Sequence, residues 1–81
     1  MITHVAIVFN GVTYSLPKPN RHHHVIRHIA DVTGATYVSG KQGFLDDLGK
    51  FLDREKALLH AKQCGQVSDT GFDELFSEDV W

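Results

Sequence analysis

The histidines of NRHHHVIRHIADVTG, residues 20–34, are the side chains of this sequence that could serve the most kinds of chemistry. A histidine can ligate a metal ion, contact a phosphate or exchange a proton near neutral pH. Adjacent residues of a helix point about 100° apart, so His22, His23 and His24 cannot converge on one ion. Only His24 and His28 could share an ion, and no H-E-x-x-H sequence supplies the assisting carboxylate of a catalytic zinc site. We therefore predict no metal site and no cofactor.

The start of the same segment favours an anion. Arg21, His22 and His23 would occupy the first turn of a helix, where free backbone N–H groups and the helix dipole attract negative charge. A guanidinium group also binds phosphate through paired donors. His24 would leave the helix about 200° from His22, away from such a site. The alternative is a polar helix surface with one or two partly buried histidines.

Other residues could extend an anion site or offer a stacking surface to a nucleobase. Arg27 lies on the same predicted helix and could add positive charge. Lys41 precedes Phe44, whose ring could stack on a nucleobase. Arg54 would begin a second helix. The alternatives are a core role for Phe44 and a solvated first-turn role for Arg54.

Motifs that mark catalysis are absent from the sequence. It contains no G-x-S-x-G, Walker or G-x-G-x-x-G pattern. Asp46 and Asp47 form an adjacent acidic pair, but adjacent acidic residues at such a position are usually turn-forming residues. Cys64, near a helix end, is typical of a small buried apolar residue. We therefore predict that the protein is not an enzyme. Sequence-specific nucleic-acid binding is not expected either, because strands separate the predicted helices and the net charge is −2.

Charge is distributed unevenly along the chain. Residues 1–65 hold eight Lys and Arg against five acidic residues, a net charge of +3, whereas residues 66–81 hold five acidic residues and no Lys or Arg. A basic body favours an anionic ligand. The acidic tail also carries large apolar residues: Phe72, Leu75, Phe76, Val80 and Trp81. We expect this tail to dock on the body or on a neighbouring subunit, the alternative being a solvated tail that keeps the protein soluble.

The first elements along the chain predict a β-hairpin. Residues 2–9 are rich in β-branched side chains, and residues 12–16 alternate between apolar and polar. Asn10-Gly11 between them accepts positive φ at both positions, which a two-residue hairpin turn requires. Pro17 would end the second strand because proline cannot donate to the ladder.

A helix over residues 21–33 follows the hairpin. Asn20 can cap its start with a side-chain acceptor, and Gly34 can adopt the left-handed conformation that ends it. Four apolar residues recur at helical spacing and should face the sheet: Val25, Ile26, Ile29 and Val32.

The remaining pattern predicts a strand, a second hairpin and a second helix. Residues 35–38 would form a short strand. A hairpin would follow, formed by the segments GFL and KFL on either side of DDLG, with Gly49 in the left-handed conformation. Asp53 would cap a helix that Gly65 ends. Residues 1–65 are thus predicted to be a single α+β domain: a small antiparallel sheet of two hairpins plus a short strand, with two helices packed on one face.

The length and composition limit the class of protein further. A chain of 81 residues is near the size at which one core is only marginally sufficient, and such chains often assemble into oligomers. The single cysteine suits a reducing cytoplasm. The N-terminus lacks the pattern of a signal peptide, and no apolar run approaches the ~20 residues of a membrane span. We expect a cytoplasmic homo-oligomer, a dimer or larger.

Several short motifs together resemble one family. The segments NGVTYSLPKPNRHHHVIR, KQGFLDDLGKFLDREKALLHAKQCGQV and LFSEDVW are similar to those of the phage Thoeris anti-defence proteins of the first described class. That family's pattern is an arginine-histidine-histidine helix start, a QGF-x-x-x-x-G-x-F hairpin, an aspartate-arginine-glutamate helix start and a terminal SED-aromatic. His24 departs from it, because the family pattern places an aspartate there, and the chain is short for the family.

The resemblance implies a sponge that sequesters the cyclic ADP-ribose signal of bacterial TIR enzymes, or a cyclic oligonucleotide, in pockets formed between subunits. It places Gln42, Gly43 and Asp53 on motif positions beside the residues already considered. The predicted ligand-binding residues are Arg21, His22, His23, Arg27, Lys41, Gln42, Gly43, Phe44 and Arg54. The predicted function is sequestration of a cyclic nucleotide immune signal during phage infection. The alternative is a small phage protein that inhibits a host nuclease or polymerase by direct contact, with its acidic tail as a phosphate mimic.

Overall fold

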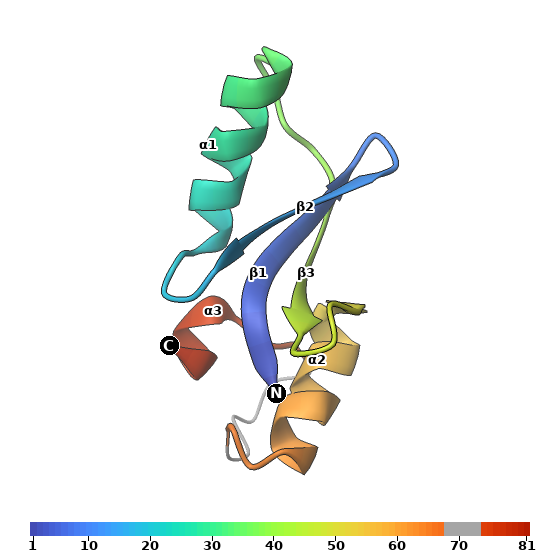
Figure 1. Ribbon diagram of the computed structural model, residues 1–81, viewed down its shortest axis with the longest axis vertical. Coiled ribbons are helices and arrows are strands. Elements are labelled where there is room, and N and C mark those ends of the chain that lie inside the picture. Colours follow the sequence, from blue (N-terminus) through green and yellow to red (C-terminus); the bar gives the residue numbers. More distant parts are fainter. Residues whose placement is uncertain (68–73) are drawn as a thin grey trace.

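The computed structural model describes residues 1–67 and 74–81, which form an antiparallel sheet with helices packed against it (Figure 1). The described elements are β1 (Ile2–Phe9), β2 (Val12–Pro17), α1 (His22–Thr33), β3 (Lys41–Asp46), β4 (Phe51–Asp53), α2 (Arg54–Gln63) and α3 (Ser77–Val80). The strand order in the sheet is β2-β1-β3-β4, and every neighbouring pair is antiparallel. The prediction of a small α+β fold is therefore confirmed.

The first hairpin forms as its turn residues predict. Asn10 and Gly11 have φ values of 51° and 76°, and Phe9 pairs with Val12 across the turn. Both φ values are positive because this turn twists in the same sense as the two strands. The hairpin places β1 at the centre of the sheet, between β2 and β3.

Helix α1 matches the predicted range but begins differently. Arg21 is its N-cap, and the prediction of Asn20 in this role is wrong, because the Asn20 amide donates to the Pro17 carbonyl at 2.7 Å. Gly34 ends the helix with φ 73°, and its N–H donates to the Ala30 carbonyl at 2.9 Å. Val25 and Ile29 are fully buried, whereas Val32 in the last turn is 58% exposed and does not join the core.

The second hairpin is organised by one buried carboxylate. Asp46 Oδ1 accepts the backbone N–H groups of Lys50 at 2.9 Å and Leu48 at 3.0 Å, and Gly49 has φ 80°. The hydrogen bond from Lys50, followed by that from Leu48, lowers the pKa of Asp46 although burial opposes the shift. Asp46 is therefore a turn-forming residue, as predicted.

Residues 35–38 do not form the predicted strand. Both edges of β1 are occupied, one by β2 and the other by β3. The segment pairs with neither outer strand of the sheet and serves as the connection from α1 to β3. The sheet of the described residues is built from the two hairpins alone.

Helix α2 begins at the predicted cap and buries a narrow face. Asp53 Oδ1 accepts the Lys56 N–H at 2.8 Å. Ala57, Leu58 and Ala61 are buried, but Cys64 is exposed, which corrects its assignment as a buried residue. Cys64 follows the last turn of the helix and so lies outside the packed stripe. Residues of α1, α2 and the sheet belong to a single core cluster.

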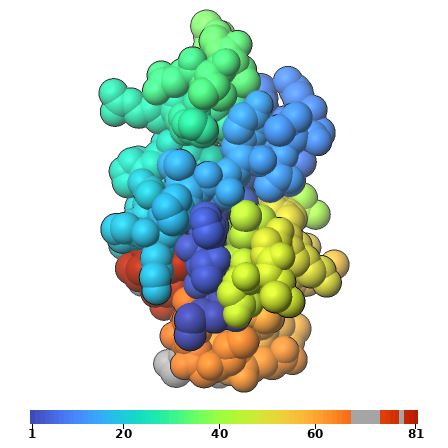
Figure 2. All heavy atoms as spheres, in the orientation of Figure 1, coloured from blue at the N-terminus to red at the C-terminus, as the bar shows by residue number. Residues whose placement is uncertain are grey.

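The described part of the C-terminal tail packs on the body. Leu75 is fully buried, and its N–H donates to the Arg54 carbonyl at 3.0 Å. The Trp81 indole N–H donates to the Asn20 carbonyl at 2.8 Å, and its ring lies edge-on to Phe44. The space-filling view shows the C-terminal residues, in red, against the segment that leads into α1 (Figure 2). This packing places the short helix α3, which the sequence pattern did not predict, beside the starts of α1 and α2.

Two further points complete the description of the chain. Phe72, one of the apolar tail residues expected to dock, lies outside the described residues. Within residues 1–67 and 74–81, no helix has both the length and the apolar character needed to cross a bilayer.

Candidate anion-binding site

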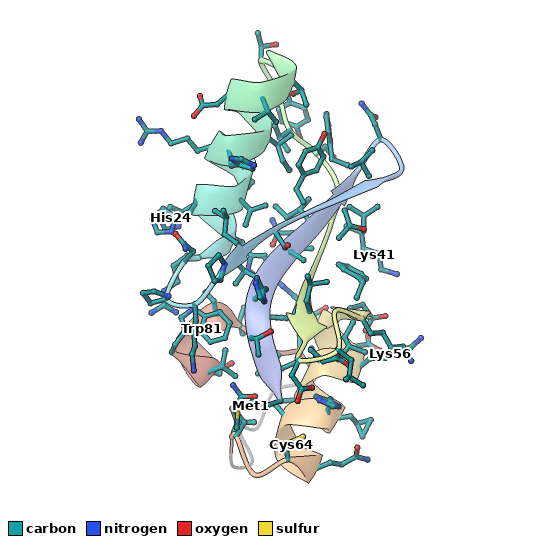
Figure 3. All side chains as sticks on the ribbon, viewed as in Figure 1. Met1, His24, Lys41, Lys56, Cys64 and Trp81 are labelled. Carbon is teal, nitrogen blue, oxygen red and sulfur yellow. The ribbon has the colours of Figure 1, made fainter. Side chains whose placement is uncertain are left out.

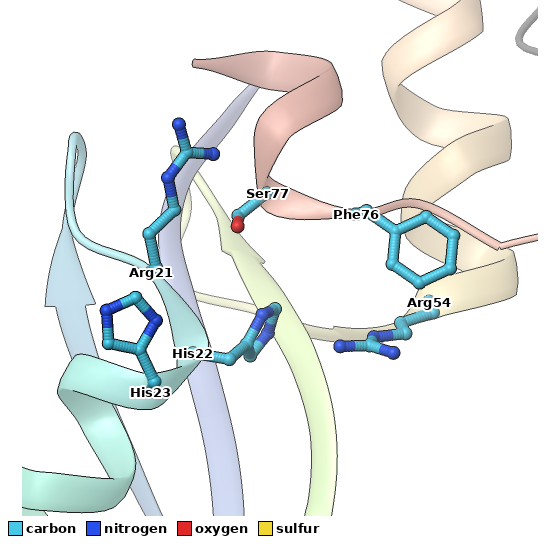
Figure 4. A pocket seen from close by; sticks show the side chains of 6 residues that line it. All are labelled: Arg21, His22, His23, Arg54, Phe76 and Ser77. Carbon is cyan, nitrogen blue, oxygen red and sulfur yellow. The ribbon is translucent and has the colours of Figure 1, made fainter.

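A cavity of about 330 Å³ lies where the three helices begin, and we call it the arginine cavity. It is lined by Arg21, His22, His23, Arg54, Phe76 and Ser77. The first three belong to the start of α1, Arg54 is the first residue of α2, and the last two begin α3. In Figure 4 these side chains surround one space, with the Ser77 hydroxyl pointing into it. Segments distant in the sequence thus meet at a single site.

Two guanidinium groups at this cavity have buried nitrogens without a hydrogen-bond partner. They are Nη1 of Arg21 and Nε of Arg54. An unpaired buried donor costs about 1–3 kcal/mol, and more when the group is charged. The ion pairs among the described residues are Met1–Asp47 and Lys41–Asp53, so neither arginine is neutralised by one of them. The cavity therefore presents positive charge and free donors, the combination that an anion satisfies.

Arg54 is held in place by two neighbours. Its Nη2 donates to the Gln42 side-chain oxygen, and its Cζ lies 5.0 Å from the centre of the Phe76 ring. A guanidinium over an aromatic face is attracted by the ring quadrupole, which is partially negative at the face of the ring. These contacts orient the guanidinium without neutralising it, so its charge stays available at the cavity.

His22 connects the cavity to the core. It is buried, and its Nε2 lies 2.7 Å from the Gly43 carbonyl oxygen. A carbonyl only accepts, so this nitrogen carries a proton and donates it. The His22 ring also lies edge-on to Phe44, with ring centres 5.0 Å apart. His22 thus fixes the start of α1 against β3, whereas His23 is exposed at the cavity mouth.

His24 stabilises the helix start from outside the cavity. Its Nδ1 accepts the backbone N–H of Arg21 at 2.9 Å, a bond that a carboxylate at the third helical position makes in a capping box. The aspartate that the family pattern places here could accept the same bond. As expected from its direction on the helix, His24 is exposed and does not line the cavity.

Replacing His24 with alanine should therefore lower the free energy of unfolding by about 1 kcal/mol or less, because the Arg21 N–H loses its acceptor. His24→Asp should retain most of the wild-type stability. Urea denaturation of the wild type and both variants measures this. Equal losses in the alanine and aspartate variants would contradict the capping role.

A second cavity of about 290 Å³ lies on the other side of Arg54. Its lining is mixed in charge: Lys41, Gln42, Asp53, Arg54, Glu55 and Glu74. Lys41 Nζ lies 3.9 Å from Asp53 Oδ2, so its charge is partly balanced. Lys41 and Gln42, both predicted to bind ligand, therefore belong to this neighbouring cavity, and Gln42 reaches the first one only through Arg54.

Three other predicted residues do not line either cavity. Phe44 is fully buried and cannot offer a face to a base, so its prediction as a ligand contact is corrected in favour of the core alternative. Gly43 is buried in β3 and acts through its carbonyl, and Arg27 is exposed farther along α1. The aromatic face at the arginine cavity belongs to Phe76 instead. The sequence signal for Phe76 and Ser77 was the terminal LFSED motif, to which no site role was assigned.

Comparison with known proteins gives one match. A family model described as the phage T4 y16D protein matches residues 1–81. No curated protein and no solved structure matches the chain.

Proposed function

The chain belongs to the phage T4 y16D protein family, and from this premise we propose that it is a phage anti-defence protein that sequesters a cyclic nucleotide signal without chemistry. The ligand class is a cyclic ADP-ribose isomer or a cyclic oligonucleotide, as the resemblance to the Thoeris anti-defence proteins implies. The observation that carries the proposal is the pair of unpartnered guanidinium nitrogens, on Arg21 and Arg54, at one cavity.

The lining of the arginine cavity suits a phosphate-bearing nucleotide. Two guanidinium groups can each form paired hydrogen bonds to phosphate oxygens. The Phe76 ring offers an aromatic surface beside them, and the Ser77 hydroxyl can donate or accept. Among the residues that the structure describes, none of those lining this cavity is a carboxylate that would repel an anion. Sequestration requires only affinity, so the signal should be released unchanged when the protein unfolds.

The size of the cavity favours an assembly of several copies. At about 330 Å³ it lies near the lower end of the roughly 300–1,000 Å³ found for small-molecule pockets. A second copy of the chain placed over its mouth would enclose more of a nucleotide. We therefore propose a homo-oligomer in the cytoplasm of the infected host, where the signal circulates. Multi-angle light scattering gives its mass.

The direct test is a ligand panel of cyclic ADP-ribose isomers and cyclic di- and trinucleotides, with AMP and ADP as linear controls. Thermal stability is measured with each compound, and a ligand at 100 times its Kd should add about 2.7 kcal/mol to the free energy of unfolding. Bound ligand released by denaturation is then identified by mass. A panel without any stabilising compound would overturn the proposal and favour direct inhibition of a host protein. A chemically altered ligand would show that the protein is an enzyme.

A further inference from the structure

A second group of reactive side chains lies at the end of α2, away from the arginine cavity, and we call it the turn–helix cluster. Asp46 is the last residue of β3, and Asp47 follows it in the turn. His60 and Cys64 come from the last turn of α2 and its C-cap. Cys64 is exposed and is the only cysteine of the chain. Figure 3 shows Cys64 beside Met1 at this end of the molecule.

Ligand atoms of Asp46, Asp47 and His60 are close enough to share one cation, and Cys64 lies beside His60. One ligand atom from each of Asp46, Asp47 and His60 lies within 4.8 Å of the others. Cys64 Sγ lies 3.6 Å from His60 Nε2. With Zn–N of about 2.0–2.1 Å and Zn–S of about 2.3 Å, two ligands at the tetrahedral angle stand about 3.6 Å apart. The histidine and the cysteine therefore already have the separation that a shared zinc ion requires.

A positively charged group already lies among these side chains. The Met1 ammonium nitrogen is 2.9 Å from His60 Nε2, 3.4 Å from Asp47 Oδ1 and 3.5 Å from Cys64 Sγ. An ammonium only donates, so His60 Nε2 presents its lone pair, which is the form that ligates a metal. The side chains thus converge on a point where positive charge is stabilised.

We propose that the turn–helix cluster is a binding site for a divalent metal ion of borderline softness, such as Zn²⁺. His60 Nε2, Cys64 Sγ and an Asp47 carboxylate oxygen supply the ligands, and Met1 moves aside. Nitrogen, sulfur and oxygen donors together favour zinc over magnesium or calcium. The Cys64 thiol loses its proton to solvent as the metal–sulfur bond forms, so binding releases one proton.

The supporting geometry comes from elements that are already folded without a metal. His60 and Cys64 are four residues apart, which places them on one side of the end of α2. Asp47 lies in the turn that Asp46 holds through its two backbone hydrogen bonds. The site needs only side-chain rotations of exposed or half-buried residues to close around an ion. It shares no residue with the arginine cavity, so the two proposals stand or fall separately.

The test uses the untagged 81-residue protein, freed of metal, and Co²⁺ as a spectroscopic substitute for Zn²⁺. We expect one Co²⁺ per chain, a thiolate-to-cobalt charge-transfer band and the intense visible bands of a tetrahedral ion. Because the chain has one cysteine, the charge-transfer band reports Cys64 alone. Added Zn²⁺ should displace the cobalt and raise the thermal midpoint. Circular dichroism should show the same fold with and without metal.

Three variants separate this site from the histidine run. Cys64→Ser should abolish the charge-transfer band, and His60→Gln should weaken cobalt binding at least tenfold. His28→Gln, which removes an exposed histidine of α1, is the matched control and should bind like the wild type. The proposal is overturned by absence of the thiolate band, or by a band that His60→Gln leaves unchanged. One metal ion per two chains would instead show that Cys64 thiolates of two copies hold it, which also overturns the site.

Discussion

Arg21→Ala and Arg54→Ala should each weaken binding of the best nucleotide by about 1.5–3 kcal/mol, the range for hydrogen bonds to charged groups. That is roughly a 10- to 150-fold rise in Kd. Each substitution removes a guanidinium that lines the arginine cavity and has a buried nitrogen without a partner. Isothermal titration at two salt concentrations measures the effect, which should be larger at low salt because the missing contacts are electrostatic.

The matched control is Arg27→Ala. Arg27 lies on the same helix as Arg21 and carries the same charge, but it is exposed and does not line the cavity. Its loss should leave Kd within about twofold of the wild type, a difference of roughly 0.4 kcal/mol. Arg21→Lys should recover only part of the affinity, because an ammonium lacks the planar pair of donors. Equal losses for Arg27→Ala and Arg21→Ala would indicate general charge attraction and contradict a specific phosphate contact.

Arg21→Ala should affect stability in the opposite direction. A buried donor without a partner is costly, so removing it relieves the free protein of that cost. Without ligand, Arg21→Ala should unfold at a temperature equal to or above that of the wild type. A variant that binds less but unfolds no earlier would indicate a residue maintained for its ligand. A large loss of stability would assign Arg21 to the structure instead.

Gly43→Ala should destabilise the fold by about 3 kcal/mol or more, at the upper end of what overpacking costs. A Cβ at this position would lie 2.3 Å from the Leu52 carbonyl oxygen and 2.6 Å from Phe51 Cζ. The carbonyl belongs to the neighbouring strand, so relief requires β3 and β4 to separate. The shift would also move the Gly43 carbonyl that accepts from His22, so nucleotide binding should fall as well.

Gly49→Ala separates crowding from backbone strain. Gly49 has φ 80°, but a Cβ there would meet nothing within 4 Å. Its substitution should cost only the roughly 1–2 kcal/mol of placing an L-residue in the left-handed region. Urea denaturation of both variants gives the comparison. If Gly49→Ala is the more damaging change, close approach of the strands at Gly43 is not the constraint we infer.

Local residue preferences were enough to predict the elements whose boundaries depend on local backbone geometry. Asn10-Gly11 and Gly49 specified two hairpins, and Gly34 and Asp53 specified a helix end and a helix start. These predictions succeeded because a positive φ or a capping bond involves residues only a few positions apart. Three of the six residues that line the arginine cavity belong to the arginine-histidine helix start, and their binding of a ligand stays a prediction.

Which predicted side chains meet and which face solvent depends on how distant segments pack together. Arg21 and Arg54 are 33 positions apart in the sequence and become neighbours because the starts of α1 and α2 meet at the arginine cavity. Phe44 and Phe76 are both plausible stacking surfaces by residue type, yet the sheet buries the first and the returning tail brings the second to the cavity. The turn–helix cluster is also a product of the tertiary structure, because a turn and a helix end contribute the proposed ligands and no sequence motif links them. Burial and convergence arise from packing between distant segments, which local residue preferences do not encode.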